Sequence, residues 1–195
     1  MYRINKVCIY LLLLLIFSAG SMSAQVVTMP SGYPVIDLSA LNPLGAVLSS
    51  TEAASRHAQI KQQTPSNTDF LSAGSSVSGQ NGSWNARMSI KYQVMRADLE
   101  VTVDWAAAWK ACASYNGEGG GTGSWRLPTQ RELLMIWILH PQLIGKGHFT
   151  AFFAGGYWSA TEYSTNNVWR VYFGNGTVGT SNKTNSFYVR CVRDL

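Results

Sequence analysis

WRLPTQREL, residues 125–133, contains the strongest local signal in the chain. Thr129 and Glu132 have the spacing of a capping box. In this motif the Thr hydroxyl accepts from a backbone N–H of the first helical turn, and the Glu carboxylate accepts from the backbone N–H of the cap residue itself. We therefore predict a helix from Gln130. It runs through LLMIWIL, residues 133–139, and should end at His140 because Pro141 follows. Because this run is apolar on every face, most of it is expected in the core, and the N-terminal segment or another subunit would cover the rest.

A second helix is predicted before this stretch, over residues 105–115. Asp104 can cap it, and an apolar face follows at helical spacing: Trp105, Ala108, Trp109 and Cys112. The helix should stop at Asn116-Gly117. The glycines of residues 119–123 read as a flexible loop, because the strand-loop-helix context of a phosphate-binding GxGxxG is missing. Two strands are expected upstream, from the alternation of Ile90, Tyr92 and Val94 and then of Leu99, Val101 and Val103.

Three strands are predicted after the helices, over residues 157–161, 168–173 and 187–192, with a hairpin turn at Asn175-Gly176. Alternation places one set of side chains toward the core: Trp169, Val171, Phe173, Phe187, Val189 and Cys191. The alternate positions should face solvent as an aromatic and basic strip: Arg170, Tyr172, Tyr188 and Arg190.

The first 24 residues have the pattern of a secretory signal, with Arg3 and Lys6 before an apolar run and small residues up to Ala24. Cys8 precedes the apolar run, so it is not expected to become a lipid-modified first residue. Removing the signal leaves 13 basic and 10 acidic side chains, a net charge of +3, with no dense Lys or Arg run for nucleic acid. No other segment has the roughly 20 apolar residues of a membrane span.

Cys112 and Cys191 remain after cleavage, and in an exported chain such a pair is most simply a disulfide. A reactive thiol is the alternative. It would need a lowered pKa beside a histidine or a helix N-terminus, and neither cysteine has such a neighbour in sequence.

Residues 25–87 differ in amino-acid composition from the rest of the chain, with four prolines and a Gly/Ser stretch at residues 72–83. We expect an extended or partly disordered N-terminal region with short strands at most, a helical turn around residues 50–60, and no second core.

Several motifs in one order carry a family resemblance. They are Trp105-Ala106 with Cys112, the Gly-rich loop, WRLPT with Glu132-Leu133, YWSATE at 157–162, residues 169–173, and VRCVR at 189–193. Over roughly residues 88–195 the chain resembles the C-terminal domain of Legionella collagen-like adhesin and the related Fibrobacter paralogous domain. Both are variants of the C-type-lectin-like fold. The resemblance implies an α+β domain, with two helices packed on small antiparallel sheets after an irregular N-terminal extension.

The superfold also holds enzymes and lectins. Formylglycine-generating enzymes resemble the chain in fold only and use cysteines for copper chemistry, whereas both cysteines here are assigned to a bridge. The calcium-binding triplets of sugar-binding C-type lectins are absent, and Glu162, Asn166 and Asn167 supply few carboxylates for calcium. His140 and His148 lack metal-site spacing. We therefore expect no catalytic residues, no metal and no cofactor.

The relatives imply adhesion to polysaccharides, including sulfated glycosaminoglycans, and QRELLMIW at 130–137 resembles exported Bacteroidetes proteins that occur with fimbrial components. We expect a non-enzymatic exported surface protein of a Gram-negative bacterium, located in the periplasm, at the cell surface or outside the cell. It would be an adhesin or fimbria-associated subunit that recognises a glycan or a fimbrial protein partner. A structural subunit without ligand and an enzyme of the formylglycine-generating type are the alternatives. The candidate ligand-binding residues are Tyr157, Tyr163, Asn166, Asn167, Arg170, Tyr172, Tyr188 and Arg190.

Overall fold

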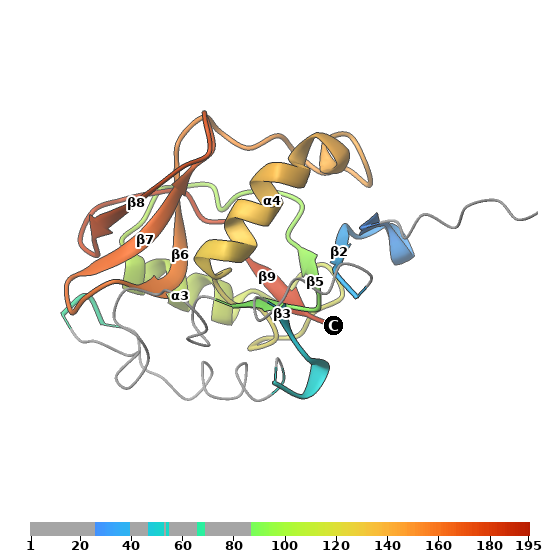
Figure 1. Cartoon of the computed structure of the whole chain (residues 1–195), viewed down its shortest axis with the longest axis horizontal. Coiled ribbons are helices and arrows are strands. Elements are labelled where there is room, and N and C mark those ends of the chain that lie inside the picture. The colour runs from blue at the N-terminus through green and yellow to red at the C-terminus, as the bar shows by residue number, and fades with distance from the viewer. Residues whose placement is uncertain (1–25, 40–46, 53, 55–65, 69–86) are drawn as a thin grey trace, which may run out of the picture.

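A computed structural model describes residues 26–39, 47–52, 54, 66–68 and 87–195 of the protein (Figure 1). The elements, in chain order, are β1 (Val27–Thr28), η1 (Pro30–Gly32), β2 (Val35–Asp37), β3 (Val47–Leu48), β4 (Met88–Ser89), β5 (Lys91–Val94), α3 (Trp105–Ser114), α4 (Gln130–Leu143), β6 (Gly156–Glu162), β7 (Asn167–Tyr172), β8 (Thr177–Asn182) and β9 (Val192–Asp194). Helices and three small sheets occur together, which confirms the predicted α+β class. The lectin-like superfold stays a prediction.

The N-terminal segment contributes short strands to the main sheet. This sheet has the order β1-β2-β5-β9, and all its neighbours are antiparallel. Val27, Ile36 and Leu38 are fully buried in the same core cluster as Leu133 and Ile136 of α4. Val27, Ile36 and Leu38 of the N-terminal region therefore pack against α4.

A second sheet pairs β3 with β4 in parallel. Residues 50–52 are helical, at the start of the turn predicted around residues 50–60, most of which lies outside the described residues. The predicted signal segment and the Gly/Ser stretch at 72–83 also lie outside them. Within the described residues, no helix combines the length and the apolar character needed to cross a membrane.

The third sheet has the order β6-β7-β8. Asn175-Gly176 forms the turn after β7, as predicted, and Gly176 has φ +75, a conformation that glycine adopts without steric cost. The strand β8 was not expected from its polar sequence. Figure 1 shows α4 between this sheet and the strands β2, β5 and β9, so α4 contributes to both sides of the core.

Helix α3 forms where it was predicted. Asp104 accepts from the backbone N–H of Ala107 at 2.8 Å, and the four predicted apolar positions are buried. Cys112 on this face is bonded to Cys191, so the expected disulfide ties α3 to the C-terminal segment across 79 positions of sequence.

Helix α4 begins at Gln130 with the complete capping box, as predicted. Its predicted end at His140 is wrong, because the helix includes Pro141 and continues to Leu143. Pro141 has no N–H for the carbonyl of Trp137, but Nδ1 of His140 lies 2.5 Å from that oxygen and can satisfy it. The apolar side chains divide as expected, since Leu133, Ile136 and Leu139 are buried while Ile138 is 54% exposed.

Two predicted strands are wrong in extent. Val103 makes only an isolated bridge with Phe187, and Val101 is 64% exposed, so residues 99–103 form no regular strand. Within residues 187–192, regular pairing begins only at Val192. These segments meet each other at single points, because neither lies beside a continuous partner strand.

Candidate binding surface

The predicted aromatic and basic strip does not form one surface. Arg190 and Tyr157 are both fully buried, so the expectation that Arg190 faces solvent is wrong. They meet at Asp98, which accepts from Nε of Arg190 at 2.5 Å and from the hydroxyl of Tyr157 at 2.6 Å. This group belongs to the interior of the domain and offers no side-chain donor to an external ligand.

Arg190 is enclosed because both faces of its segment are covered. Cys191 and Val189 pack into the cluster around α3 on one side. On the other side the guanidinium lies 4.1 Å from the ring centroid of Phe152, and its Nη1 donates to the carbonyl of Arg96 at 2.8 Å. Simple alternation assumes one solvated face, and that condition fails here.

Tyr157 is locked into the same network. Burial, then the hydrogen bond to Asp98 and the charge of that carboxylate, raise the pKa of the Tyr157 phenol. Its oxygen also accepts from the backbone N–H of Phe153 at 2.9 Å. The phenol therefore stays protonated and holds the 153 loop in place.

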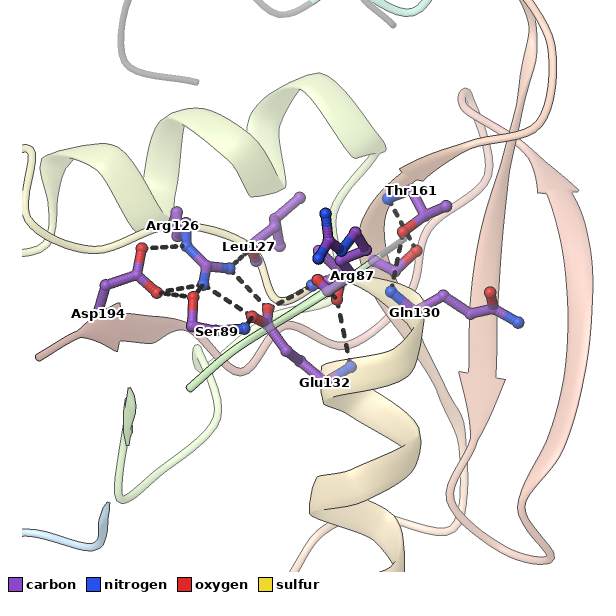
Figure 2. Close-up of polar contacts among 10 residues, drawn as sticks. Arg87, Ser89, Arg126, Leu127, Gln130, Glu132, Thr161 and Asp194 are labelled. Carbon is purple, nitrogen blue, oxygen red and sulfur yellow. Dashed lines mark hydrogen bonds and ion pairs between the residues drawn. The ribbon is translucent and has the colours of Figure 1, made fainter. Parts of the chain in front are cut away.

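Arg126 occupies a second interior network (Figure 2). Its Nη1 and Nη2 donate to the two carboxylate oxygens of Glu132 at 2.7 and 2.9 Å, and its Nε donates to Asp194 at 3.1 Å. Burial alone would lower the pKa of Arg126, but the charges of Asp194 and Glu132 hold it above its usual value. Arg126 has a structural role, since its side chain is 2% exposed and joins α4 to β9.

Lys183 and Glu162 form a third interior pair that the sequence did not reveal. Their side chains are 0% and 1% exposed, Nζ to Oε1 is 2.5 Å, and Nζ lies 4.5 Å from the ring centroid of Trp105. Glu162 was considered as a source of oxygen ligands, but this carboxylate is engaged inside the protein.

Arg170 and Tyr172 do reach the surface, on one face of β7 as predicted. Nε of Arg170 donates to the hydroxyl of Ser181 on β8 at 2.8 Å, and the guanidinium lies 5.1 Å from the ring centroid of Phe187. Tyr172 beside it is 37% exposed. We call Arg170, Tyr172, Ser181 and Phe187 the Arg170 surface.

Two glycines open this surface. A Cβ on Gly156 would lie 2.7 Å from Phe187 and 3.4 Å from Cδ of Arg170, so only glycine lets ring and stem pack together there. Gly179, opposite Arg170 in the β7-β8 pairing, has nothing within 4 Å of a Cβ position. The guanidinium is thus held from one side with open space over the neighbouring strand.

Arg170 also differs from the interior arginines in its charge balance. Within the described part of the chain no carboxylate lies in ion-pair distance of it, whereas Arg126 and Arg190 each contact one or more. A half-buried guanidinium with Nε engaged keeps its Nη groups for an external acceptor. The sequence suggested Arg170, but Ser181 and Phe187 as its supports were missed, because β8 was missed and Phe187 was expected only in the core.

The remaining candidates lie in two other places. Tyr188 is half-buried, with its ring stacked on Phe153 at 4.8 Å and 16°, and Phe153 is 58% exposed. Tyr163, 43% exposed, packs edge-on against Trp169 near the β6-β7 turn. Asn166 lies in this turn, and Asn167, the first residue of β7, donates through its side chain to the hydroxyl of Ser164.

The exposed candidate residues offer aromatic rings and hydrogen-bond donors to a ligand. The described residues contain no group of three or more His, Cys, Asp and Glu side chains placed to hold a metal. His148 is exposed in a loop, and His140 contacts the carbonyl of Trp137. The Arg170 surface can accept an anionic group beside an aromatic ring, which is a binding function.

Comparison with known proteins gives one family. No curated protein matches the chain. The family model of the Lcl C-terminal domain matches residues 83–193, which include α3, α4, the β6-β7-β8 sheet and both bonded cysteines. Because this match covers more than half of the chain and agrees with the motif order, the protein belongs to the Lcl C-terminal domain family.

Proposed function

We propose that the protein is a non-enzymatic, exported recognition protein that binds acidic extracellular polysaccharide at the Arg170 surface. The family match supports the coarser part, a surface-associated protein. The observation that carries the finer part is the uncompensated guanidinium of Arg170, fixed by Ser181 and Phe187. An adhesin or a fimbria-associated subunit would use such a surface at the cell exterior.

A carboxylate or sulfate group suits this arrangement. A guanidinium whose Nε is engaged still presents two Nη donors that can bond an oxyanion in bidentate fashion. The exposed ring of Tyr172 can lie against the C–H face of a sugar ring beside it, because aromatic side chains combine an apolar body with a polar end. Charge and ring together favour acidic sugars over neutral ones.

Enzyme activity of the formylglycine-generating type is disfavoured by the cysteines. Cys112 and Cys191 are bonded to each other and fully buried, so neither offers a thiolate for copper.

A heparin column tests the proposal. Arg170→Ala should elute at lower salt than wild type, because a charge-assisted hydrogen bond contributes about 1.5–3 kcal/mol, and 1.4 kcal/mol is about tenfold in affinity. Arg170→Lys keeps the charge but not the planar fork, and should fall between them. Arg131→Ala, which removes the same charge from α4, is the matched control and should elute with wild type.

A glycan array read with and without chelator tests the metal-free mode. Binding to acidic glycans should persist in chelator. Equal retention of wild type and Arg170→Ala on heparin, together with an array that shows no acidic glycan bound, favours the structural subunit without ligand.

A further inference from the structure

Strand β8 has a free edge in the β6-β7-β8 order. All six of its residues pair with β7 in continuous register, from Thr177 opposite Tyr172 to Asn182 opposite Asn167. In Figure 1, β8 forms the outer side of its sheet, away from α4. Within the described part of the chain, this full-length strand is therefore paired on one side only.

The bonding pattern identifies the backbone groups on that free side. Phe173 donates to Gly155 across the β6 side, and Lys183 donates to Asn166 across the β8 side. Because antiparallel strands alternate their bonding directions, Thr177, Gly179 and Ser181 bond to β7 while Val178 and Thr180 point their N–H and C=O outward. Among the described residues, none bonds to these outward groups.

The other sheet edges are short or occupied. The edge strand β1 has two residues, and Val192 of β9 exchanges backbone hydrogen bonds with Arg126. On the outer side of β6, Trp158 donates to the carbonyl of Tyr188. By contrast β8, TVGTSN, carries no charge and no proline, the usual devices that prevent an edge strand from pairing.

We propose that two copies of the protein pair through β8 in antiparallel orientation, with Gly179 opposite Gly179 and Val178 opposite Thr180. This register forms four backbone hydrogen bonds from the outward groups of the two strands. A second copy fits because the uncharged strand meets itself without like-charge repulsion. Gly179 at the two-fold axis allows the close approach of a non-hydrogen-bonded pair, about 4.5 Å between Cα atoms.

Pairing would also join the two Arg170 surfaces, a consequence that rests on the proposed function. The two-fold axis is perpendicular to the sheet, so both copies present Arg170 on the same face of a six-stranded sheet. The two β7 strands would be three strand spacings apart, roughly 14 Å. One acidic polymer could then contact both sites, and its apparent affinity would rise through multivalency.

Sedimentation velocity across a concentration series tests the pairing. Wild type should shift from monomer to dimer as concentration rises. Thr180→Pro removes the outward N–H, at an edge position where proline is tolerated, and should stay monomeric with an unchanged thermal midpoint. Thr180→Ala keeps the N–H and should dimerise like wild type. A wild type that remains monomeric up to about 1 mM, a very weak affinity, would overturn the proposal.

Hydrogen exchange identifies the interface if dimers form. The amides of Val178 and Thr180 should become protected at high concentration, at least tenfold relative to dilute protein. If dimers form in Thr180→Pro as well, or protection rises only elsewhere, β8 is not the interface. Thr180→Pro should retain heparin binding with fewer contacts, whereas Arg170→Ala should lose it without affecting the dimer, so failure of either proposal is distinguishable from failure of the other.

Discussion

At the scale of single residues, the environment of each guanidinium determines its role. Arg126 and Arg190 are enclosed with carboxylates, and their charges are satisfied inside the protein. Arg170 has a hydroxyl and a ring as neighbours, and no carboxylate among the described residues pairs with it. The cost of removing each side chain should therefore separate stability from binding.

Arg190→Ala should destabilise the protein by about 3–5 kcal/mol, because it leaves the carboxylate of Asp98 buried without its cation. Arg170→Ala should cost about 1 kcal/mol, the value of one ordinary hydrogen bond. Urea unfolding measures both. Similar losses for the two variants would contradict the distinction drawn between them.

Tyr157→Phe should lower the unfolding free energy by about 1–3 kcal/mol, since Asp98 and the N–H of Phe153 each lose a buried partner. The raised pKa of Tyr157 adds a pH dependence. A raised pKa in the folded state means that its stabilisation is complete below the unfolded value, 10.0, and is lost as pH rises above it. Between pH 9 and 11, roughly around that pKa, wild type should lose more stability than Tyr157→Phe.

At the scale of elements, the start of α4 connects a local cap to distant strands. Glu132 accepts from the N–H of Thr129 at 2.8 Å, as a cap should, and from the N–H of Ser89 at 2.9 Å. The same carboxylate accepts from the guanidinium of Arg126. That guanidinium also donates to Asp194, the last residue of β9. One side chain therefore fixes the helix start, β4 and the C-terminal strand together.

Thr129→Ala and Glu132→Ala should separate these roles. The first removes the cap hydroxyl and should cost about 1 kcal/mol. The second also removes the carboxylate bound by both Nη groups of Arg126 and by the N–H of Ser89, leaves Asp194 as the remaining ion-pair partner of Arg126, and should cost about 3–5 kcal/mol. Thermal unfolding of both variants measures the difference, and equal small effects would show that the ion pair contributes little.

At the scale of the whole molecule, segments distant in sequence complete one core. Strands β1 and β2 add Val27, Val35 and Ile36 to the core, and Leu38 and Leu48 add two more buried side chains from the N-terminal part. The disulfide joins α3 to the segment before β9. The stability of the domain should thus depend on residues outside the 83–193 region.

A chain limited to residues 83–193 should be much less stable than one covering 26–195. It lacks the buried side chains of β1 and β2, each contributing about 1.5–3 kcal/mol, and Asp194 as a partner of Arg126. Circular dichroism melts compare the stability of the two chains. A cooperative transition at the same temperature in both would show that the N-terminal strands contribute little to the stability of the domain.

Replacing both cysteines by serine should lower the unfolding free energy by about 2–5 kcal/mol, because the unfolded chain regains the freedom of a long loop. Denaturant unfolding of the double variant measures this loss, and wild type treated with reductant is the control. An unchanged midpoint in both would mean that the bridge is dispensable.

The sequence alone determined the features that depend on near neighbours. The caps at Asp104 and Thr129 and the turn at Asn175-Gly176 need only residues a few positions apart. The pairing of Cys112 with Cys191 followed from their being the two cysteines after the predicted signal segment. Only the tertiary structure determined whether the side chains on the second face of a strand are buried or exposed. Arg170 and Arg190 occupy equivalent positions in the apolar–polar alternation of their segments. Only Arg190 is covered by Asp98 and the 149–153 loop, which lie far from it in sequence. In the same way β8 is a strand because β7 pairs with it, and the backbone hydrogen bonds of that pairing leave no mark on the sequence TVGTSN.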